Sequence, residues 1–164
     1  MPANEREDLL KRLDRARSHL EGLLAKVDPA QEIYPGWTIR QLLAHITGWD
    51  EDTLATLVAH QSGKAPALTA VRGFDEFNER TLSSRQDLDL DHVIQEWHST
   101  RAKLKALLAE LPEEKYRTTL VASWGERIRV TELIEVFIGH EEYHARDLRE
   151  WLQNPSQPLR KKGN

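Results

Sequence analysis

The chain has 164 residues and a formal net charge of −4, with 39% hydrophobic and 30% charged residues. This length suits one domain around a single core, and the acidic balance offers no basic field to a phosphate backbone, which counts against a nucleic-acid partner. The chain contains no cysteine, so disulfides, thiolate metal sites and cysteine nucleophiles are excluded.

The first residues of the chain do not resemble a targeting signal, and its hydropathy does not indicate a membrane span. Residues 1–8 are polar and charged, unlike a signal peptide. No apolar run approaches the roughly 20 residues that span a bilayer. We therefore expect a cytoplasmic protein without a membrane partner. Residues 1–154 are predicted to form one domain, followed by a polar C-terminal tail over 155–164.

Helical periodicity marks the first half of the chain. The first predicted helix runs from about residue 4 to 27 and stops before Pro29. The second begins at Thr38, which forms a capping-box pattern with Gln41, and ends near Gly63. Each helix carries an apolar stripe for a shared core.

Two further helices are predicted at about residues 89–111 and 131–151, and the fold class is an all-α four-helix bundle. A long crossover connection joins the second and third helices, which allows them to run parallel. Within it, residues 74–80 are expected to form a short helix. Residues 120–130 alternate apolar and polar around a glycine, which suits either a short hairpin or a loop.

Histidine spacing in the last predicted helix carries the clearest chemical signal. His140 and His144 lie four residues apart, which on a helix places them on one face about 6 Å apart. That spacing lets two imidazoles bind one metal ion. His45 shares an apolar face with Leu42 and Trp49 in the second predicted helix, so it can oppose the pair.

Three imidazoles from two helices would leave coordination positions open for water and substrate, as in a catalytic zinc or similar divalent site. Hydrogen-bonded core histidines are the alternative, and the spacing alone leaves both open. The other four histidines occupy polar or boundary positions and are predicted to be surface residues: His19, His60, His92 and His98.

Two motifs resemble the DinB/YfiT-like four-helix-bundle superfamily. Residues 37–46, Trp-Thr-Ile-Arg-Gln-Leu-Leu-Ala-His-Ile, are similar to the start of its second helix, and residues 139–144, Gly-His-Glu-Glu-Tyr-His, resemble its closing His-x-x-x-His. The resemblance extends over about residues 5–153. It implies that His45, His140 and His144 bind a divalent metal, zinc or nickel in most members.

The same resemblance implies several activities. The superfamily includes metal-dependent S-transferases that use low-molecular-weight thiols, thiol-dependent isomerases, and related colibactin self-protection proteins. The connecting segment is somewhat similar to that of the self-protection branch, but that branch does not generally keep the metal histidines. Retention of all three histidines favours the metal-binding members, although fold alone does not define the reaction.

Our hypothesis is a metal-activated water or thiol that attacks a small electrophile in the bundle cavity. Asp52 and Asp147 are candidates to orient an imidazole or act as general base, with solvated helix carboxylates as the alternative. Tyr143 is a candidate hydrogen-bond donor to substrate, with simple packing as the alternative. Glu141 and Glu142 are predicted to be solvated.

Three functions follow as candidates. The first is a metal-dependent S-transferase or hydrolase acting on a small molecule, with a low-molecular-weight thiol as cosubstrate. The second is a non-catalytic small-molecule binding or sequestration protein, and the third, a DNA-damage effector, conflicts with the acidic balance. A homodimer is compatible with the bundle. Among the tryptophans, Trp49, Trp97 and Trp151 are predicted to lie in the core, whereas Trp124 is a candidate pocket residue.

Overall fold

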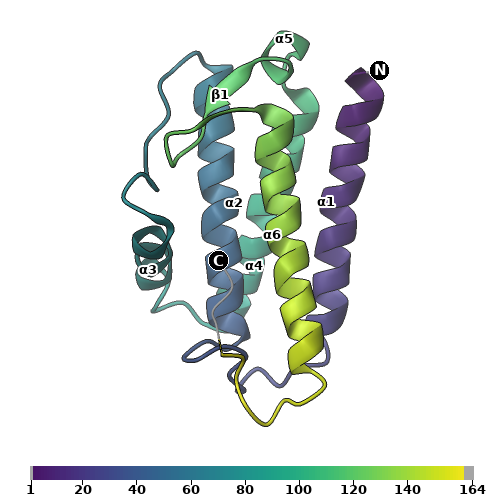
Figure 1. Ribbon diagram of the computed structural model, residues 1–164, viewed down its shortest axis with the longest axis vertical. Coiled ribbons are helices and arrows are strands. Elements are labelled where there is room, and N and C mark those ends of the chain that lie inside the picture. The colour runs from purple at the N-terminus through teal and green to yellow at the C-terminus, as the bar shows by residue number, and fades with distance from the viewer. Residues whose placement is uncertain (1, 161–164) are drawn as a thin grey trace.

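Four long helices pack side by side in the computed structural model, which describes residues 2–160 (Figure 1). The long helices are α1 (Pro2–Leu24), α2 (Ile39–Gln61), α4 (Leu90–Glu110) and α6 (Val130–Trp151). The shorter elements are α3 (Phe74–Ser84), α5 (Glu113–Tyr116), β1 (Thr119–Val121) and β2 (Arg127–Arg129). The all-α four-helix bundle and the short helix in its long connection are confirmed.

The long crossover makes α2 and α4 parallel neighbours. Arg40, near the start of α2, donates to the carbonyl of Leu88, just before α4, at 3.3 Å. Asp50, halfway along α2, contacts Arg101, halfway along α4. The crossover returns along the outside of α2 and carries α3 there (Figure 1). The prediction that these two long helices run parallel is confirmed.

Gly48 lets α3 approach α2 closely. A Cβ atom at this position would lie 2.1 Å from Cγ2 of Thr81 in α3, which is too short for two carbon atoms. One residue along, the Trp49 indole N–H donates to Oδ1 of Asn78 at 2.9 Å. These contacts hold the middle of α3 against α2, and at its start the Phe74 ring lies 5.6 Å from the Trp49 ring.

Local signals set the ends of the elements. The Thr38 N–H donates to the Gln41 side chain at 3.0 Å, as the capping-box pattern predicted. Between α5 and α6, β1 and β2 pair antiparallel with Leu120 opposite Ile128, and Gly125 in the turn has a φ of 95°. The hairpin, one of the two alternatives for this segment, is therefore the correct one.

The interior is apolar on both sides of the histidine site. Trp49, Trp97 and Trp151 are all buried, as predicted.

The segment after α6 is not wholly solvated, because the Leu159 N–H donates to the Ile33 carbonyl at 2.7 Å and the Leu159 side chain packs on the core. The rest of the predicted tail, residues 161–164, lies outside the described residues. Over residues 2–160, none of the helices combines the length and apolar character needed to cross a bilayer.

Candidate metal centre

Three imidazoles converge inside the bundle between α2 and α6. Nε2 of His140 lies 3.0 Å from Nε2 of His45 and 3.0 Å from Nε2 of His144. All three rings offer a nitrogen within 4.8 Å of the others, the arrangement needed to bind one ion. His45 and His144 are fully buried, and His140 is partly exposed. The predicted convergence of these residues is confirmed, and their binding of a metal stays a prediction.

Protonation of this cluster is disfavoured. Burial lowers the pKa of His45 well below its usual 6.5, and the neighbouring His140 lowers it further. Burial, with His140 and His45 close by, lowers the pKa of His144 in the same way. Neutral imidazoles present nitrogen lone pairs, and three of them facing one point suit zinc or another borderline divalent ion. The donor set therefore fits a divalent metal.

Tyr34, in the loop between α1 and α2, fixes the orientation of His144. Its hydroxyl donates to Oδ2 of Asp147 at 2.6 Å and lies 3.0 Å from Nδ1 of His144. Because the phenol proton is directed to Asp147, its oxygen accepts the Nδ1–H of His144, which leaves Nε2 unprotonated and facing His140. Burial and the bond to Asp147 raise the pKa of Tyr34, so the phenol stays protonated.

Asp147 therefore contacts His144 through Tyr34. Tyr34 was not among the residues predicted for the site. Asp147 was predicted to orient an imidazole, and the contact exists only through the Tyr34 hydroxyl. Tyr143 is half-buried, with its ring 5.7 Å from the His144 ring and 5.1 Å from the Arg146 guanidinium. Its proposed hydrogen bond to substrate stays a prediction.

Asp52 serves a different part of the molecule. It lies seven residues beyond His45, about 10 Å further along α2, too far to orient that ring. Its carboxylate accepts a hydrogen bond from the Thr69 hydroxyl in the crossover. Burial raises the pKa of Asp52, and the hydrogen bond from Thr69 and the charge of Arg80 offset part of this rise. The structure therefore supports Asp52 as an anchor for the crossover and not as an orienting residue of the histidine cluster.

An apolar pocket of about 400 Å³ opens beside His140. Its lining residues come from α2, α3, α6 and the hairpin turn, and most are aromatic: Trp49, Phe74, Trp124, Glu126, Val136, Phe137 and His140. His140 thus belongs both to the histidine cluster and to the pocket wall. The pocket position considered for Trp124 is confirmed.

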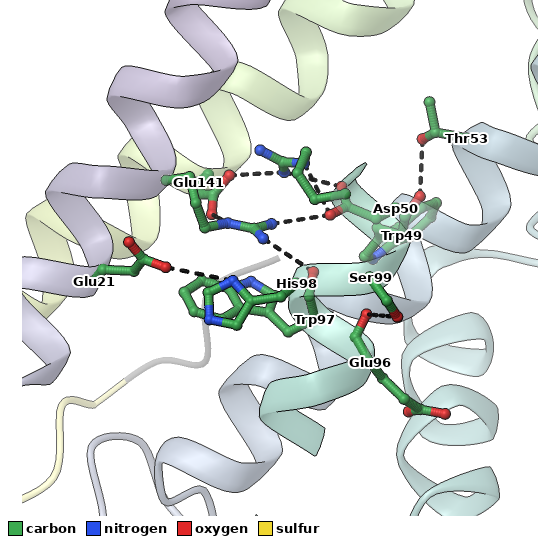
Figure 2. Close-up of polar contacts among 11 residues, drawn as sticks. Glu21, Trp49, Asp50, Thr53, Glu96, Trp97, His98, Ser99 and Glu141 are labelled. Atoms are coloured by element: carbon green, nitrogen blue, oxygen red, sulfur yellow. Dashed lines mark hydrogen bonds and ion pairs between the residues drawn. The ribbon is translucent and has the colours of Figure 1, made fainter. Parts of the chain in front are cut away.

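The residue after His140 faces a buried ion network (Figure 2). The prediction that Glu141 is solvated is wrong, because its side chain is fully buried. Its oxygens lie 2.6 Å from Nε of Arg17 and 2.7 Å from Nη2 of Arg101. Both arginines also reach Asp50, at 3.0 Å each, so two positive and two negative groups form a closed set.

The four charged residues of this set, hereafter the ion quartet, tie together α1, α2, α4 and α6: Arg17, Asp50, Arg101 and Glu141. The sequence held one signal for the ion quartet, because Arg17 lies between Leu13 and Leu20 within the apolar stripe of α1. A charged residue at such a position needs a buried partner. Tyr34 carried no comparable signal, because a loop residue has no periodicity.

The fold and the site define a four-helix-bundle protein with a buried three-histidine cluster. Residues 12–148 match the model of the DinB superfamily, and the chain belongs to that superfamily. None of the curated protein sequences matches the chain.

Several solved structures share the fold. A mycothiol-dependent maleylpyruvate isomerase superposes with a TM-score of 0.74 at 19% identity, over 87% of this chain and 60% of that one. The sibling lethal factor precursor DfsB gives 0.76 at 18% identity, covering 93% and 97% of the two chains. An uncharacterised protein from Escherichia coli UTI89 gives 0.74 at 15% identity, with 94% and 96% coverage. The chain thus spans about 60% of the isomerase, and likeness at these identities shows the fold alone.

Proposed function

We propose that this protein is a metal-dependent enzyme that joins a low-molecular-weight thiol to a small electrophilic molecule. The convergence of three imidazole nitrogens beside an apolar pocket carries the proposal. A divalent ion held there would lower the pKa of a bound thiol or water and so supply a nucleophile near neutral pH. The mycothiol-dependent isomerase with the same fold supports a thiol as that nucleophile.

The chain's own residues would hold and shield the reactants. His45 and His144 are buried and fixed, and Tyr34 with Asp147 keeps the metal-facing nitrogen of His144 unprotonated. The pocket rings exclude water from the electrophile. Because the chain has no cysteine, the thiol comes from outside. When the thiol adds to an activated alkene, the sulfur–carbon bond forms at one alkene carbon and the thiol proton ends on the other. The addition therefore needs no oxidant.

A thiol-consumption assay tests this function. Protein loaded with zinc or nickel is incubated with mycothiol or glutathione and a panel of activated alkenes, and the remaining free thiol is measured. We expect at least one pair to react about tenfold faster than background, with the excess lost in His140→Ala and kept in His92→Ala, a surface histidine at the start of α4. Background rates for every pair, from protein carrying a full complement of metal, would contradict the proposal.

The second candidate is a non-catalytic binding protein that sequesters a small molecule. The observation favouring it is the pocket lining, which has few polar groups to orient a reacting molecule. Ligand binding without thiol consumption would support this alternative. For either function we propose a small molecule as partner, with no nucleic acid or membrane, and the homodimer stays a prediction.

A further inference from the structure

A second pocket, of about 220 Å³, lies at the end of the bundle where α5 and the hairpin meet the end of α2 (Figure 1). Three of its lining side chains are cationic, and each comes from a different segment: Lys64 from the start of the crossover, Lys115 from α5 and Arg127 from β2. Among the residues that the structure describes, its lining contains no aspartate or glutamate. This pocket, hereafter the basic pocket, concentrates positive charge in a chain whose net charge is −4.

Backbone turns bring the two lysines to the end of α2. The helix ends in a turn through Gly63, whose φ of 67° favours glycine, and the Lys64 N–H closes this turn on the Ala59 carbonyl at 2.9 Å. Lys115 is held beside the same helix end, because Nε2 of His60 lies 2.9 Å from the Lys115 carbonyl oxygen. Local structure therefore sets the positions of both lysine backbones around the pocket.

The hairpin contributes a guanidinium and a hydroxyl to the basic pocket. Glu126 lines the other pocket, beside His140. Arg127, the next residue, lines the basic pocket instead, as expected when consecutive strand residues point to opposite faces. Nη1 of Arg127 donates to the Thr119 hydroxyl oxygen at 3.4 Å, and this hydroxyl keeps its own proton for another acceptor. The hairpin thus directs its cation and its carboxylate to different pockets.

The three cations of the basic pocket have no acidic partner within ion-pair distance among the described residues. Glu113, two residues before Lys115, is paired instead with Arg6 at 3.0 Å and with Arg117 at 2.6 Å. Like charges around one concavity repel one another, and such a concavity raises the local concentration of anions. A bound anion would supply the missing counter-charge.

A phosphate group matches these donors better than a carboxylate does. Near pH 7 a phosphate monoester carries about two negative charges on three terminal oxygens, whereas a carboxylate carries one charge on two oxygens. A guanidinium can donate to two phosphate oxygens at once, and ammonium and hydroxyl groups can donate to the third. The volume is below that of sites for drug-sized ligands, which suits a phosphate with at most a small organic group.

We propose that the basic pocket binds the phosphate group of a small molecule, with Lys64, Lys115 and Arg127 as its cationic contacts. Thr56, which also lines this pocket, lies eleven residues beyond His45 and therefore about 16 Å further along α2. The site is thus separate from the histidine cluster, and the proposal does not rest on the proposed enzymatic function.

Isothermal titration calorimetry at low ionic strength tests the preference for phosphate. The probes are glycerol 3-phosphate, glycerate and glycerol, which share a three-carbon body, together with inorganic phosphate. We expect glycerol 3-phosphate to bind about tenfold more tightly than glycerate, and glycerol not to bind. Inorganic phosphate binding as tightly as the ester would identify the free ion as the ligand, and weaker binding would identify a phosphate ester. Equal affinities for glycerol 3-phosphate and glycerate, or no binding of either phosphate at about 10 mM, would overturn the proposal.

Substitutions of exposed cations localise the binding. Lys64→Gln and Arg127→Gln each remove one charge from the pocket and should weaken the binding of glycerol 3-phosphate about fivefold and about tenfold. Lys103→Gln removes the same charge from an exposed position on α4 outside the lining, and should change the affinity by less than about twofold. Equal weakening in Lys64→Gln and Lys103→Gln would overturn the proposal, because net charge alone would then explain the binding.

A histidine variant distinguishes the basic pocket from the metal centre, where a phosphate could also bind to a metal ion. We expect His140→Ala, with folding confirmed by circular dichroism, to bind glycerol 3-phosphate like the wild type. That result would support the basic pocket whether or not the proposed enzymatic function is correct. Binding that is lost in His140→Ala and kept in Arg127→Gln would place the phosphate at the histidine cluster and overturn the proposal.

Discussion

Two buried polar regions begin at consecutive residues of α6, His140 and Glu141, and differ in how their polar groups are paired. Glu141 belongs to the ion quartet, where each charge faces opposite charges at 2.6–3.0 Å. His140, one residue earlier, faces two further imidazoles at 3.0 Å. In the first region every charge has oppositely charged partners within the chain, whereas the second gathers three groups of one kind around a single point.

The difference teaches how to distinguish a structural polar cluster from a binding one. A closed set of opposite charges holds helices together and needs nothing from outside. Nε2 of His140 carries either one hydrogen atom or one lone pair, so it cannot form a full hydrogen bond with both Nε2 of His45 and Nε2 of His144 at 3.0 Å. A divalent cation satisfies them together, which is why we assign binding to the histidine cluster and positioning to the ion quartet.

The largest expected effect comes from breaking the ion quartet. Glu141→Gln keeps the shape but leaves two arginines facing Asp50 alone, and an uncompensated buried charge costs about 3–5 kcal/mol. Urea unfolding of the metal-free protein measures the loss. Glu142→Gln, the exposed neighbour, should change stability by less than about 0.5 kcal/mol. Equal effects of the two substitutions would show that the quartet contributes no stability.

The increase in stability on zinc binding should distinguish the histidine cluster from the ion quartet. Free zinc at about 100 times its dissociation constant should stabilise the wild type by about 2.7 kcal/mol. His144→Ala should lose this increment, because one of three ligands is gone, while Glu142→Gln should retain it. Thermal unfolding with and without zinc gives the increment for each variant. A zinc increment preserved in His144→Ala would contradict the assignment of that residue as a ligand.

A smaller effect is expected from the residues that orient His144. Tyr34→Phe removes the hydroxyl between His144 and Asp147, and loss of such a partner lowers metal affinity about 10–100-fold. Competition against a chelating dye measures the affinity. Tyr116→Phe deletes another buried hydroxyl, near the hairpin end of the bundle, and serves as the matched control. If both variants bind zinc like the wild type, Tyr34 has no orienting role.

The smallest effect is a pH dependence of metal-free stability. The pKa values of His45 and His144 are lowered in the folded state, so below about pH 6.5 the unfolded chain binds protons that the folded chain does not. Stability is therefore fully present above that pH and falls as the pH drops, by about 1 kcal/mol per histidine at one unit lower. Urea titrations at several pH values should show a shallower slope in a His45→Gln, His144→Gln double variant. An identical slope in wild type and variant would contradict the lowered pKa values.

Much of the bundle followed from local patterns. Apolar stripes located the four long helices, and the Thr38–Gln41 pattern marked the start of α2, because both depend on residues within one or two turns. The spacing of His140 and His144 fixed their shared face for the same reason. These features need no knowledge of what packs against the helix.

Features that depend on packing were missed. We expected Glu141 to be solvated because consecutive residues point about 100° apart on a helix. In α6, however, the buried arc is wide enough to include Phe137, Ile138 and Glu141 together. A wide buried arc arises when a helix has neighbours on two sides, which its own sequence does not specify. Tyr34 was missed because only the folded loop brings it to His144.

The central claim is that the three histidines bind one divalent ion, and metal analysis tests it most directly. Wild type, His45→Ala and His92→Ala are dialysed against limiting zinc or nickel and analysed by mass spectrometry, with circular dichroism to confirm folding. The account predicts close to one ion per chain in wild type and His92→Ala, and almost none in folded His45→Ala. No bound ion in the wild type, or equal content in folded His45→Ala, would contradict it and leave the histidines as core residues.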